Sequence, residues 1–347
     1  MNLKQRIIDL SSTMTVSGYE SRAHAALREQ LGGIFDEITT DAVGSVICTR
    51  RCGRAGAPKI LIDAHIDEIG MMVTEILDGG FLRVLNLGGI DTRIMPAAEV
   101  CIYGEETIYG VVASTPPHLQ KADEAKTLKP ITELLIDTGY SRDKLEQIVS
   151  LGTPVGFVPR YTELLGGKIT GKGFDNKSCA AIAAEAIASV ERGALAGDVT
   201  LLLAVQEETT MLGGTTGAAG IDPDYALVTD VTFGETPDTK KGDAFPLGGG
   251  VVISLSAVTD RRLTARTVEL AKEKGIGYSR SVEPTGTGTD ANATQLTNCG
   301  IPTVVVSLPL RYMHTYHEML SLDDAEALRA LIAAFICDSR IAEDFAR

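Results

Sequence analysis

The stretch VTLLLAVQEETTMLGG (199–214) passes from a series of apolar and β-branched residues into two adjacent carboxylates, Glu207 and Glu208. A short, continuous apolar run is typical of a strand that helices cover on both faces, as in α/β proteins. The simplest interpretation of the Glu-Glu pair is a solvated junction between strand and loop. The alternative is a pair of functional groups at the end of a buried strand, and the rest of the chain decides between the two.

Three other stretches have the same character, being short, apolar and bounded by polar residues: KILIDAHID (59–67), DYALVTDVT (224–232) and IPTVVVSLP (301–309). Two helical patterns accompany them. Residues 176–194 are Ala-rich and end in Glu-Arg-Gly, and residues 322–345 carry acidic residues in their first turn. This alternation predicts an α/β fold with a mixed, largely parallel sheet flanked by helices.

The middle of the chain has a different pattern. Its segments are short, β-rich and punctuated by Gly and Pro, as in GGFLRVLNLGG and AAEVCIYGEETIYGVVAS. Strands at such close spacing predict a small β-barrel or sandwich, with one helix at about 141–150. We therefore expect a discontinuous α/β domain formed by residues 1–70 and 160–347, with residues 71–159 as an inserted β-barrel domain. A short amphipathic helix is expected at the N-terminus.

Composition excludes several classes of function. Among the 347 residues, 44% are hydrophobic and 22% are charged, which is typical of a globular protein. The net charge of -14 opposes binding to nucleic acid, and no apolar run reaches the roughly 20 residues that span a membrane. The N-terminus lacks the apolar core of a signal peptide. Six cysteines are scattered without a Cys-x-x-Cys pair, which predicts buried thiols in a cytoplasmic protein: Cys48, Cys52, Cys101, Cys179, Cys299 and Cys337.

Groups that bind metals follow the four apolar strands. In open α/β sheets, functional groups gather beyond the carboxyl ends of the strands. The residues at the strand ends are His65 and Asp67, Glu207 and Glu208, Asp230, and His314 or His317. One further residue, Asp175, stands just before the Ala-rich helix. Each has a simpler interpretation on its own, such as a helix cap for Asp175 or a turn for Asp230. However, the chain has only five histidines, and two of them lie at the ends of core strands, so the joint pattern favours a metal site.

The chemistry of such a set is coherent. Two divalent cations would be balanced by three carboxylates and one bridging hydroxide, with two neutral imidazoles as further ligands. Paired metals about 3.5–4 Å apart make hydroxide available at neutral pH and polarise a carbonyl group. Mixed His and carboxylate ligation suits zinc, cobalt or manganese better than calcium. Because successive strand side chains point to opposite sides, one glutamate could hold metal while its neighbour faces the substrate water.

Six motifs, in order, resemble those of the dinuclear-metal aminopeptidases of the glutamyl/tetrahedral (TET) type: DAHIDEIGMMV, GKGFDNKSCAA, VQEE, TDVTF, GTDANA and RYMHT. GVVASTPPHL and LLIDTGYSRDKLEQIVSLGTPVG resemble the inserted barrel of that family, and VSGYE resembles its N-terminal signature. The resemblance covers nearly the whole chain. It implies a zinc-exopeptidase-like fold and removal of N-terminal residues from peptides.

The resemblance also implies a ligand set. His65 and Asp230 would bind one metal ion, Glu208 and His314 would bind the other, and Asp175 would bridge the two. Two divalent ions per chain are implied, with zinc or cobalt first and manganese as an alternative.

Further roles follow from the same resemblance. Glu207 would act as general base and acid, and Asp67 would orient the imidazole of His65, as partners of metal-bound histidines usually do. His314 is preferred to His317 because it occupies the Met-His-Thr position of the motif. The turn TTMLGGTTGA (209–218) departs from the family pattern, which puts the nearby substrate pocket in question. Asp290 has no assigned role, and a turn aspartate is its simplest interpretation.

The resemblance implies partners as well. The barrel would mediate dimers, and six dimers would close a tetrahedral dodecamer whose inward-facing sites admit only unfolded peptides. Three alternatives to an aminopeptidase remain. A glycosidase needs carboxylates about 5–9.5 Å apart across the sugar and is disfavoured by the absence of Trp. A metal-stabilised binding protein and a carboxypeptidase on a related scaffold are the others.

Overall fold

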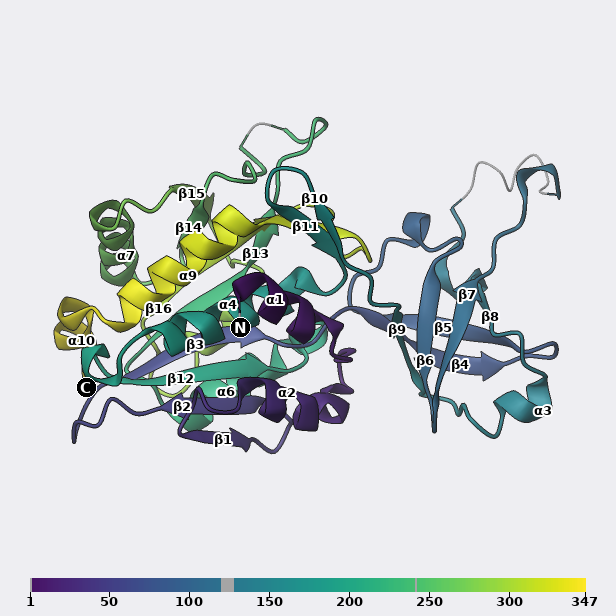
Figure 1. The fold of residues 1–347 in the computed structure, drawn as a ribbon, viewed down its shortest axis with the longest axis horizontal. Coiled ribbons are helices and arrows are strands. Elements are labelled where there is room, and N and C mark those ends of the chain that lie inside the picture. Colours follow the sequence, from purple (N-terminus) through teal and green to yellow (C-terminus); the bar gives the residue numbers. More distant parts are fainter. Residues whose placement is uncertain (1, 120–127, 241) are drawn as a thin grey trace.

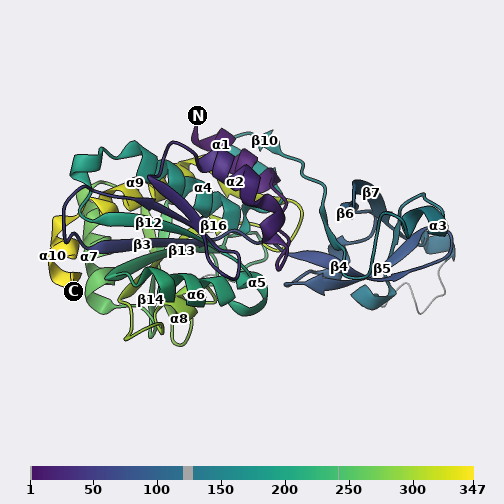
Figure 2. The ribbon, with the colours of Figure 1, turned by 90° about the horizontal axis from the view of Figure 1, so that it is seen from below.

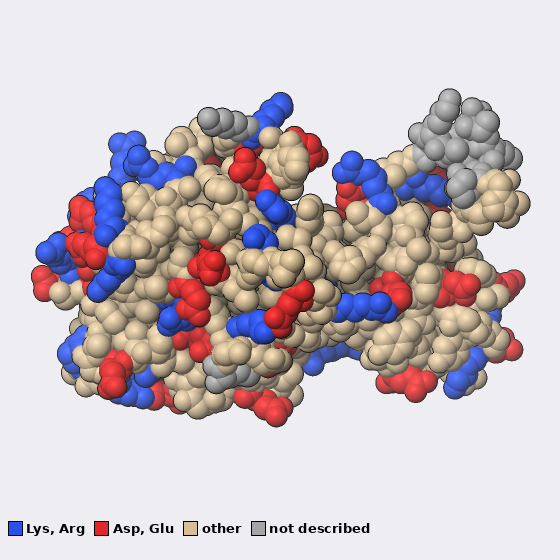
Figure 3. All heavy atoms as spheres, turned by 45° about the horizontal axis from the view of Figure 1, so that its top comes forward, with Lys and Arg blue, Asp and Glu red and all other residues tan. Residues whose placement is uncertain are grey.

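The computed structural model describes residues 2–119, 128–240 and 242–347. A broad α/β lobe carries both termini, and a narrower β lobe stands to one side of it (Figure 1). Acidic and basic side chains are interspersed on the face of the molecule that Figure 3 presents. Within the described ranges, no helix combines the length and the apolarity that crossing a bilayer requires.

An eight-stranded sheet forms the centre of the α/β lobe. Its strands, in spatial order, are β1 (Glu37–Thr40), β2 (Val46–Arg50), β12 (Asp198–Ala204), β3 (Lys59–His65), β13 (Tyr225–Phe233), β16 (Thr303–Leu310), β14 (Val251–Ser256) and β15 (Tyr278–Glu283). The four central strands β12, β3, β13 and β16 are parallel, whereas β2 and β14 pair with them in the antiparallel sense. The predicted mixed, largely parallel sheet is confirmed.

Helices cover both faces of this sheet (Figure 2). They are α1 (Leu3–Ser12), α2 (His24–Leu31), α4 (Phe174–Ser189), α5 (Glu207–Thr210), α6 (Leu212–Ile221), α7 (Arg261–Glu273), α8 (Ala291–Thr294), α9 (Leu322–Ile336) and α10 (Ser339–Phe345). Strand β3 contributes side chains to both faces of the sheet. Ile60 and Ile62 belong to the core beneath α4 and α9, whereas Leu61 belongs to a smaller core beneath α6. The continuous apolar run is therefore a strand buried on both faces.

Two helix predictions need correction. The Ala-rich helix ends at Ser189 rather than at residue 194, because Val190 adopts an extended conformation. The predicted single helix 322–345 is two helices, α9 and α10. Asp338 separates them, and its side chain accepts a hydrogen bond from the backbone N–H of Ile341, which caps the start of α10.

The narrower lobe is a closed six-stranded barrel, as predicted. In spatial order its strands are β4 (Gly70–Ile76), β5 (Phe81–Leu87), β8 (Leu135–Asp137), β7 (Thr107–Val112), β6 (Glu99–Tyr103) and β9 (Pro154–Phe157). In β7 the inward side chains of Ile108 and Val112 are buried, while Tyr109 and Val111 face outward and are exposed. The predicted helix at about 141–150 is a single turn, α3 (Arg142–Leu145).

The chain enters the barrel immediately after a central strand of the large sheet. Only Ile66–Ile69 separate β3 from β4, so the barrel departs from the carboxyl end of β3. The chain returns through a small three-stranded sheet of β10 (Thr162–Leu164), β11 (Lys168–Gly171) and β17 (Glu318–Ser321). The edge of the large sheet where functional groups are expected therefore faces the barrel lobe.

The cysteines are free thiols among the described residues. Cys48, Cys52, Cys101 and Cys179 are buried, as expected. The expectation is wrong for Cys299, which is exposed, and only half right for Cys337, which is partly buried.

Candidate metal centre

The parallel strands bring the predicted groups to one edge of the sheet. His65 is the last residue of β3 and pairs in register with Ala204, the last residue of β12. Asp230 lies in the neighbouring strand β13, and its side chain is buried. Short helix α5, which begins with the two glutamates, lies at the same end of the sheet (Figure 2).

A first group of possible ligands surrounds the imidazole of His65. Its Nε2 atom lies 3.2 Å from Oδ1 of Asp175 and 3.6 Å from Oδ1 of Asp230. All three side chains are buried. One ligand atom from each lies close enough to the others to hold a single metal ion.

A second group lies on the other side of Asp175. Nε2 of His314 is 3.5 Å from Oδ2 of Asp175 and 3.4 Å from Oε2 of Glu208. These three residues also meet the spacing for one ion. The two carboxylate oxygens of Asp175 thus face two different imidazoles, as a bridging ligand requires. His317, the alternative to His314, is exposed and belongs to neither group.

Glu207 and Glu208 are not strand residues, so the argument from strand alternation is wrong. Strand β12 ends at Ala204, and Gln206 adopts a left-handed conformation with φ of 58° that turns the chain into α5. The two side chains still face different histidines. Oε2 of Glu207 is 3.8 Å from Nε2 of His65, whereas Glu208 faces His314.

Asp67 contacts both His65 and the two glutamates. Its carboxylate accepts hydrogen bonds from the backbone N–H groups of Glu207, at 3.0 Å, and Glu208, at 3.2 Å. The group within hydrogen-bond distance of His65 is the backbone oxygen of Asp67, 3.1 Å from Nδ1, while the carboxylate lies 3.5 Å away. A carbonyl acceptor requires Nδ1 to carry a proton, so in the neutral ring the lone pair lies on Nε2, the nitrogen that faces the carboxylates.

Glu318 is a functional candidate that the sequence analysis missed. Its buried carboxylate accepts hydrogen bonds from the backbone N–H groups of Phe174 and Asp175, at 2.7 and 3.1 Å, and from that of His314, at 3.2 Å. One side chain thus ties together two segments that carry possible ligands. The signal was its position four residues after His314, in the same polar motif.

A buried cluster of charges supports the segment behind Asp67. Glu68 accepts hydrogen bonds from Nζ of Lys172, at 2.6 and 2.7 Å, and its carboxylate lies 3.0 Å from Nζ of Lys177. Lys177 also donates to the backbone oxygen of Thr13. All three side chains are buried, so the cluster links the β3–β4 segment to the residue that follows β11 and to α4.

The barrel lobe also reaches the candidate centre. Gly88 and Gly89, in the segment after β5, lie against the second group of ligands. A Cβ atom at Gly89 would lie 2.8 Å from Nδ1 of His314, and one at Gly88 would lie 3.2 Å from Oε2 of Glu208. The absence of side chains at these two positions lets the barrel approach so closely.

The clustered carboxylates shift one another's titration. Burial, together with neighbouring carboxylates, raises the pKa of Glu207 to about 8 and the pKa of Glu208 to about 10. Burial acts to lower the pKa of His65, but the carboxylates of Glu207 and Asp230 outweigh it and hold that pKa well above 6.5. Protons relieve the repulsion of this buried anionic set, and divalent cations would do so in their place.

Asp290 lies behind the site rather than in an exposed turn. It is buried just before α8, and neither of its carboxylate oxygens accepts a hydrogen bond from the described residues. Burial first, and then the charge of Asp63, raises its pKa well above the ordinary value. Asp63 is itself buried and accepts a hydrogen bond from the hydroxyl of Thr294. Asp290 does lie in a turn, directly before α8, but that turn is buried.

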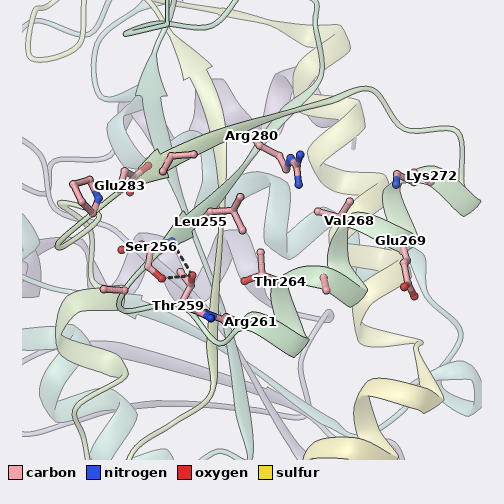
Figure 4. A pocket seen from close by; sticks show the side chains of 14 residues that line it. Leu255, Ser256, Thr259, Arg261, Thr264, Val268, Glu269, Lys272, Arg280 and Glu283 are labelled. Atoms are coloured by element: carbon pink, nitrogen blue, oxygen red, sulfur yellow. Dashed lines mark hydrogen bonds between the residues drawn. The ribbon is translucent and has the colours of Figure 1, made fainter.

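A hollow of about 410 Å³ opens onto both groups of ligands and includes Glu207 in its lining. A larger hollow, of about 840 Å³, lies between α7, β14 and β15 (Figure 4). It mixes basic residues such as Arg280 and Lys272 with acidic Glu269 and Glu283, and no possible metal group of the described residues lies there. We therefore assign the chemistry to the smaller hollow.

Two imidazoles and several carboxylates gathered beside the parallel strand ends of an α/β sheet are typical of a metalloenzyme. Residues 44–331 match the M42 glutamyl aminopeptidases, and the chain belongs to that family. It is 31% identical to the lysyl aminopeptidase of Pyrococcus furiosus, over 92% of this chain and 93% of the relative.

Solved structures agree with this assignment. The TET aminopeptidase of the marine sediment archaeon Thaumarchaeota archaeon SCGC AB-539-E09 has a TM-score of 0.91 at 28% identity, covering 99% of this chain and 98% of that one. The Pyrococcus horikoshii TET1 peptidase, which can assemble into a tetrahedron or a large octahedral shell, has a TM-score of 0.83 at 30% identity, covering 96% and 99%. The predicted family and fold are confirmed, and family membership favours an aminopeptidase over the three alternatives.

Proposed function

We propose that this aminopeptidase holds two divalent metal ions and uses Glu207 to move protons during hydrolysis of the N-terminal peptide bond. His65 and Asp230 would hold one ion, Glu208 and His314 the other, and Asp175 both. The observation that carries the proposal is the position of Asp175, whose two carboxylate oxygens lie 3.2 and 3.5 Å from the imidazoles of two different groups. We refer to these five residues as the candidate metal centre.

The residues fit such ions chemically. The donors are imidazole nitrogens and carboxylate oxygens, which suit zinc or cobalt first and manganese as an alternative. The hydrogen bond from Nδ1 of His65 to a backbone oxygen leaves Nε2 free to donate its lone pair. When bound, the ions supply a Lewis acid that lowers the pKa of water and polarises the scissile carbonyl.

Glu207 suits the role of general base and acid because it borders the hollow but belongs to neither group of ligands. The carboxylate of Asp67 fixes the start of α5 by accepting hydrogen bonds from the backbone N–H groups of both glutamates. The carboxylate of Glu207 would accept a proton from the attacking water and deliver it to the departing amine. Asp67 thus positions Glu207 as well as His65.

A panel of aminoacyl-p-nitroanilides tests this proposal. Protein stripped of metal by a chelator should be inactive, and zinc or cobalt should restore hydrolysis. Elemental analysis should find two ions per chain at full activity, and saturation at one ion with full activity would contradict the dinuclear centre. Failure to hydrolyse any member would favour a binding protein. Cleavage restricted to peptides with a free C-terminus would instead indicate a carboxypeptidase.

We also propose that the barrel lobe, residues 71–159, mediates dimers and that six dimers close a tetrahedral shell in the cytoplasm. The assemblies of the Pyrococcus horikoshii relative support this proposal. Apolar side chains on the outside of the barrel support it too, because Tyr109 is 65% exposed and Val111 is 45% exposed. Free buried thiols are consistent with a reducing compartment.

A further inference from the structure

The hollow beside the candidate metal centre is lined in part by residues that have no role in the proposed reaction. We call these residues its second wall. Eight of its lining residues are neither proposed ligands nor Glu207: Met211, Val231, Thr232, Phe233, Thr287, Gly288, Thr289 and Met313. If the proposed function holds, the side chain of the substrate's first residue must lie against part of this wall. Its chemistry therefore bears on which N-terminal residues the enzyme removes.

All eight residues are uncharged. A glutamyl side chain would find no Lys or Arg among the described residues that line the hollow. For a lysyl side chain, the only carboxylates among the described lining residues are those of Glu207 and of the candidate metal centre. The ions would already engage the acids of the centre, and Glu207 is assigned to proton transfer. Bringing a charged group out of water without a partner is costly. An apolar side chain would meet no such cost and would contact two thioethers and a phenyl ring.

Met211 occupies the turn that departs from the family pattern. It joins α5 to α6 in a left-handed conformation, with φ of 55°, and its N–H donates to the backbone oxygen of Gln206. Tight packing fixes this turn. A Cβ atom at Gly213 would lie 2.2 Å from the backbone nitrogen of Val205, and one at Gly214 would lie 2.5 Å from Oδ1 of Asp290. The Gly-Gly pair thus lets the start of α6 pack closely against Val205 and Asp290, and Met211 lines the hollow close before this pair.

Two further apolar side chains flank proposed ligands. Phe233 ends β13, three residues after Asp230, and is 61% exposed. Met313 directly precedes His314 and is partly buried. Phe233 lines this hollow and is largely exposed, so a side chain bound there would remove apolar surface of the ring from water.

We propose that this enzyme prefers an uncharged, apolar N-terminal residue of the size of leucine or methionine, and that Met211, Phe233 and Met313 determine this preference. The inference rests on the proposed function. We therefore expect neither lysyl nor glutamyl residues to be the preferred N-terminal residues of its substrates.

The test compares kcat/KM for leucyl-, methionyl-, alanyl-, glutamyl- and lysyl-p-nitroanilide on the intact, metal-loaded assembly. We expect leucyl and methionyl substrates to exceed the glutamyl and lysyl ones by at least about tenfold, in line with the 10–200-fold effect of one methylene in an apolar pocket. A glutamyl or lysyl optimum would overturn the inference while leaving the aminopeptidase intact. Hydrolysis of no substrate would overturn the proposed function and the inference with it.

A pair of charge variants tests Met211 itself. Met211→Lys should raise the glutamyl-to-leucyl ratio of kcat/KM by up to about fivefold, and Met211→Glu should raise the lysyl-to-leucyl ratio similarly, as expected for one new, partly exposed ion pair. The same two changes at Val282, which is 77% exposed on edge strand β15 outside this hollow, serve as matched controls. Equal shifts from both positions, or none from Met211, would show that Met211 does not contact the substrate. Metal content, measured in parallel, confirms that the variants keep their ions.

Discussion

At the scale of single residues, the neighbouring glutamates should be separable by experiment. Glu207→Gln removes a proton acceptor but leaves the proposed ligands intact, so metal content should stay unchanged. Turnover should fall by roughly 10²–10⁴-fold, the usual effect of losing a general base. Elemental analysis and kcat check the two expectations. Added zinc or cobalt should not rescue this variant, and rescue would mean that Glu207 is a ligand.

Glu208→Gln should behave differently. A neutral amide is a weaker ligand, and Glu208 faces His314 at 3.4 Å within the second group. We expect weaker binding of one ion and partial recovery of activity in excess zinc or cobalt. Isothermal titration calorimetry, in which zinc or cobalt is added to the metal-free protein, measures the affinity for the ions. If both glutamine variants are as active as the parent, the pair is only the solvated junction that its sequence also permits.

Four of the five proposed ligands could be predicted from the sequence because they lie at or after the ends of apolar runs, and the ends of parallel strands meet at one edge of a sheet. Asp175 instead stands at the start of the Ala-rich helix. Glu318 could not be found in this way. Its reach to Asp175 and His314 depends on the pairing of β17 with β11, two segments about 150 residues apart in the sequence. The burial of Asp290 likewise depends on the close approach of α6, which no local pattern encodes.

At the scale of elements, the segment after β5 should control the second group of ligands. Gly89→Ala places a methyl group where the imidazole of His314 now lies, since the built Cβ is only 2.8 Å from Nδ1. The ring is the movable partner, so we expect it to shift and the affinity for one ion to fall while the other is retained. The visible absorption spectrum of the cobalt-loaded protein reports this change. Gly79→Ala is unsuitable as a control because Gly79 has a positive φ, whereas Gly193→Ala meets no atom within 4 Å.

The buried cluster around Glu68 should stabilise the junction between the β3–β4 segment, β11 and α4. Glu68→Gln leaves Lys172 and Lys177 buried without their partner, which we expect to cost about 3–5 kcal/mol of the free energy of unfolding. Chemical denaturation measures the loss. Although burial opposes it, the two lysines lower the pKa of Glu68 below 4.5. Its stabilising effect is therefore present above pH 4.5 and is lost as the pH falls through the lowered value. A stability unchanged by the substitution would contradict this account.

Elements were predicted unevenly. Buried strands were found because their apolar runs are continuous, and the barrel because Gly and Pro punctuate its strands. The break between α9 and α10 was missed because Asp338 lies within an otherwise helical pattern and acts only through its cap to Ile341. The start of α5 at Glu207 was missed because the left-handed conformation of Gln206 has no signature in the sequence.

At the scale of the whole molecule, the outer surface of the barrel should decide the state of assembly. Tyr109→Glu places a charge among exposed apolar side chains of the barrel, so we expect dimers and larger shells to dissociate. Light scattering measures the mass. Val282→Glu, on the edge of the α/β lobe, should leave the assembly intact. A parent protein that is monomeric and fully active would refute the proposed assembly, and a stable dimer would remove only the shell.

The insertion of the barrel directly after His65 has a consequence for synthesis on the ribosome. In the sheet, β3 lies between β12 and β13, whose residues follow it by more than 130 positions. The barrel contains all of its own strand partners and can fold as it leaves the exit tunnel, whereas β3 must wait for strands not yet translated. The last proposed ligand along the chain, His314, is added almost 250 residues after His65. A nascent chain that has not yet reached His314 therefore cannot assemble the proposed centre, so proteolytic activity is withheld until translation has passed that residue.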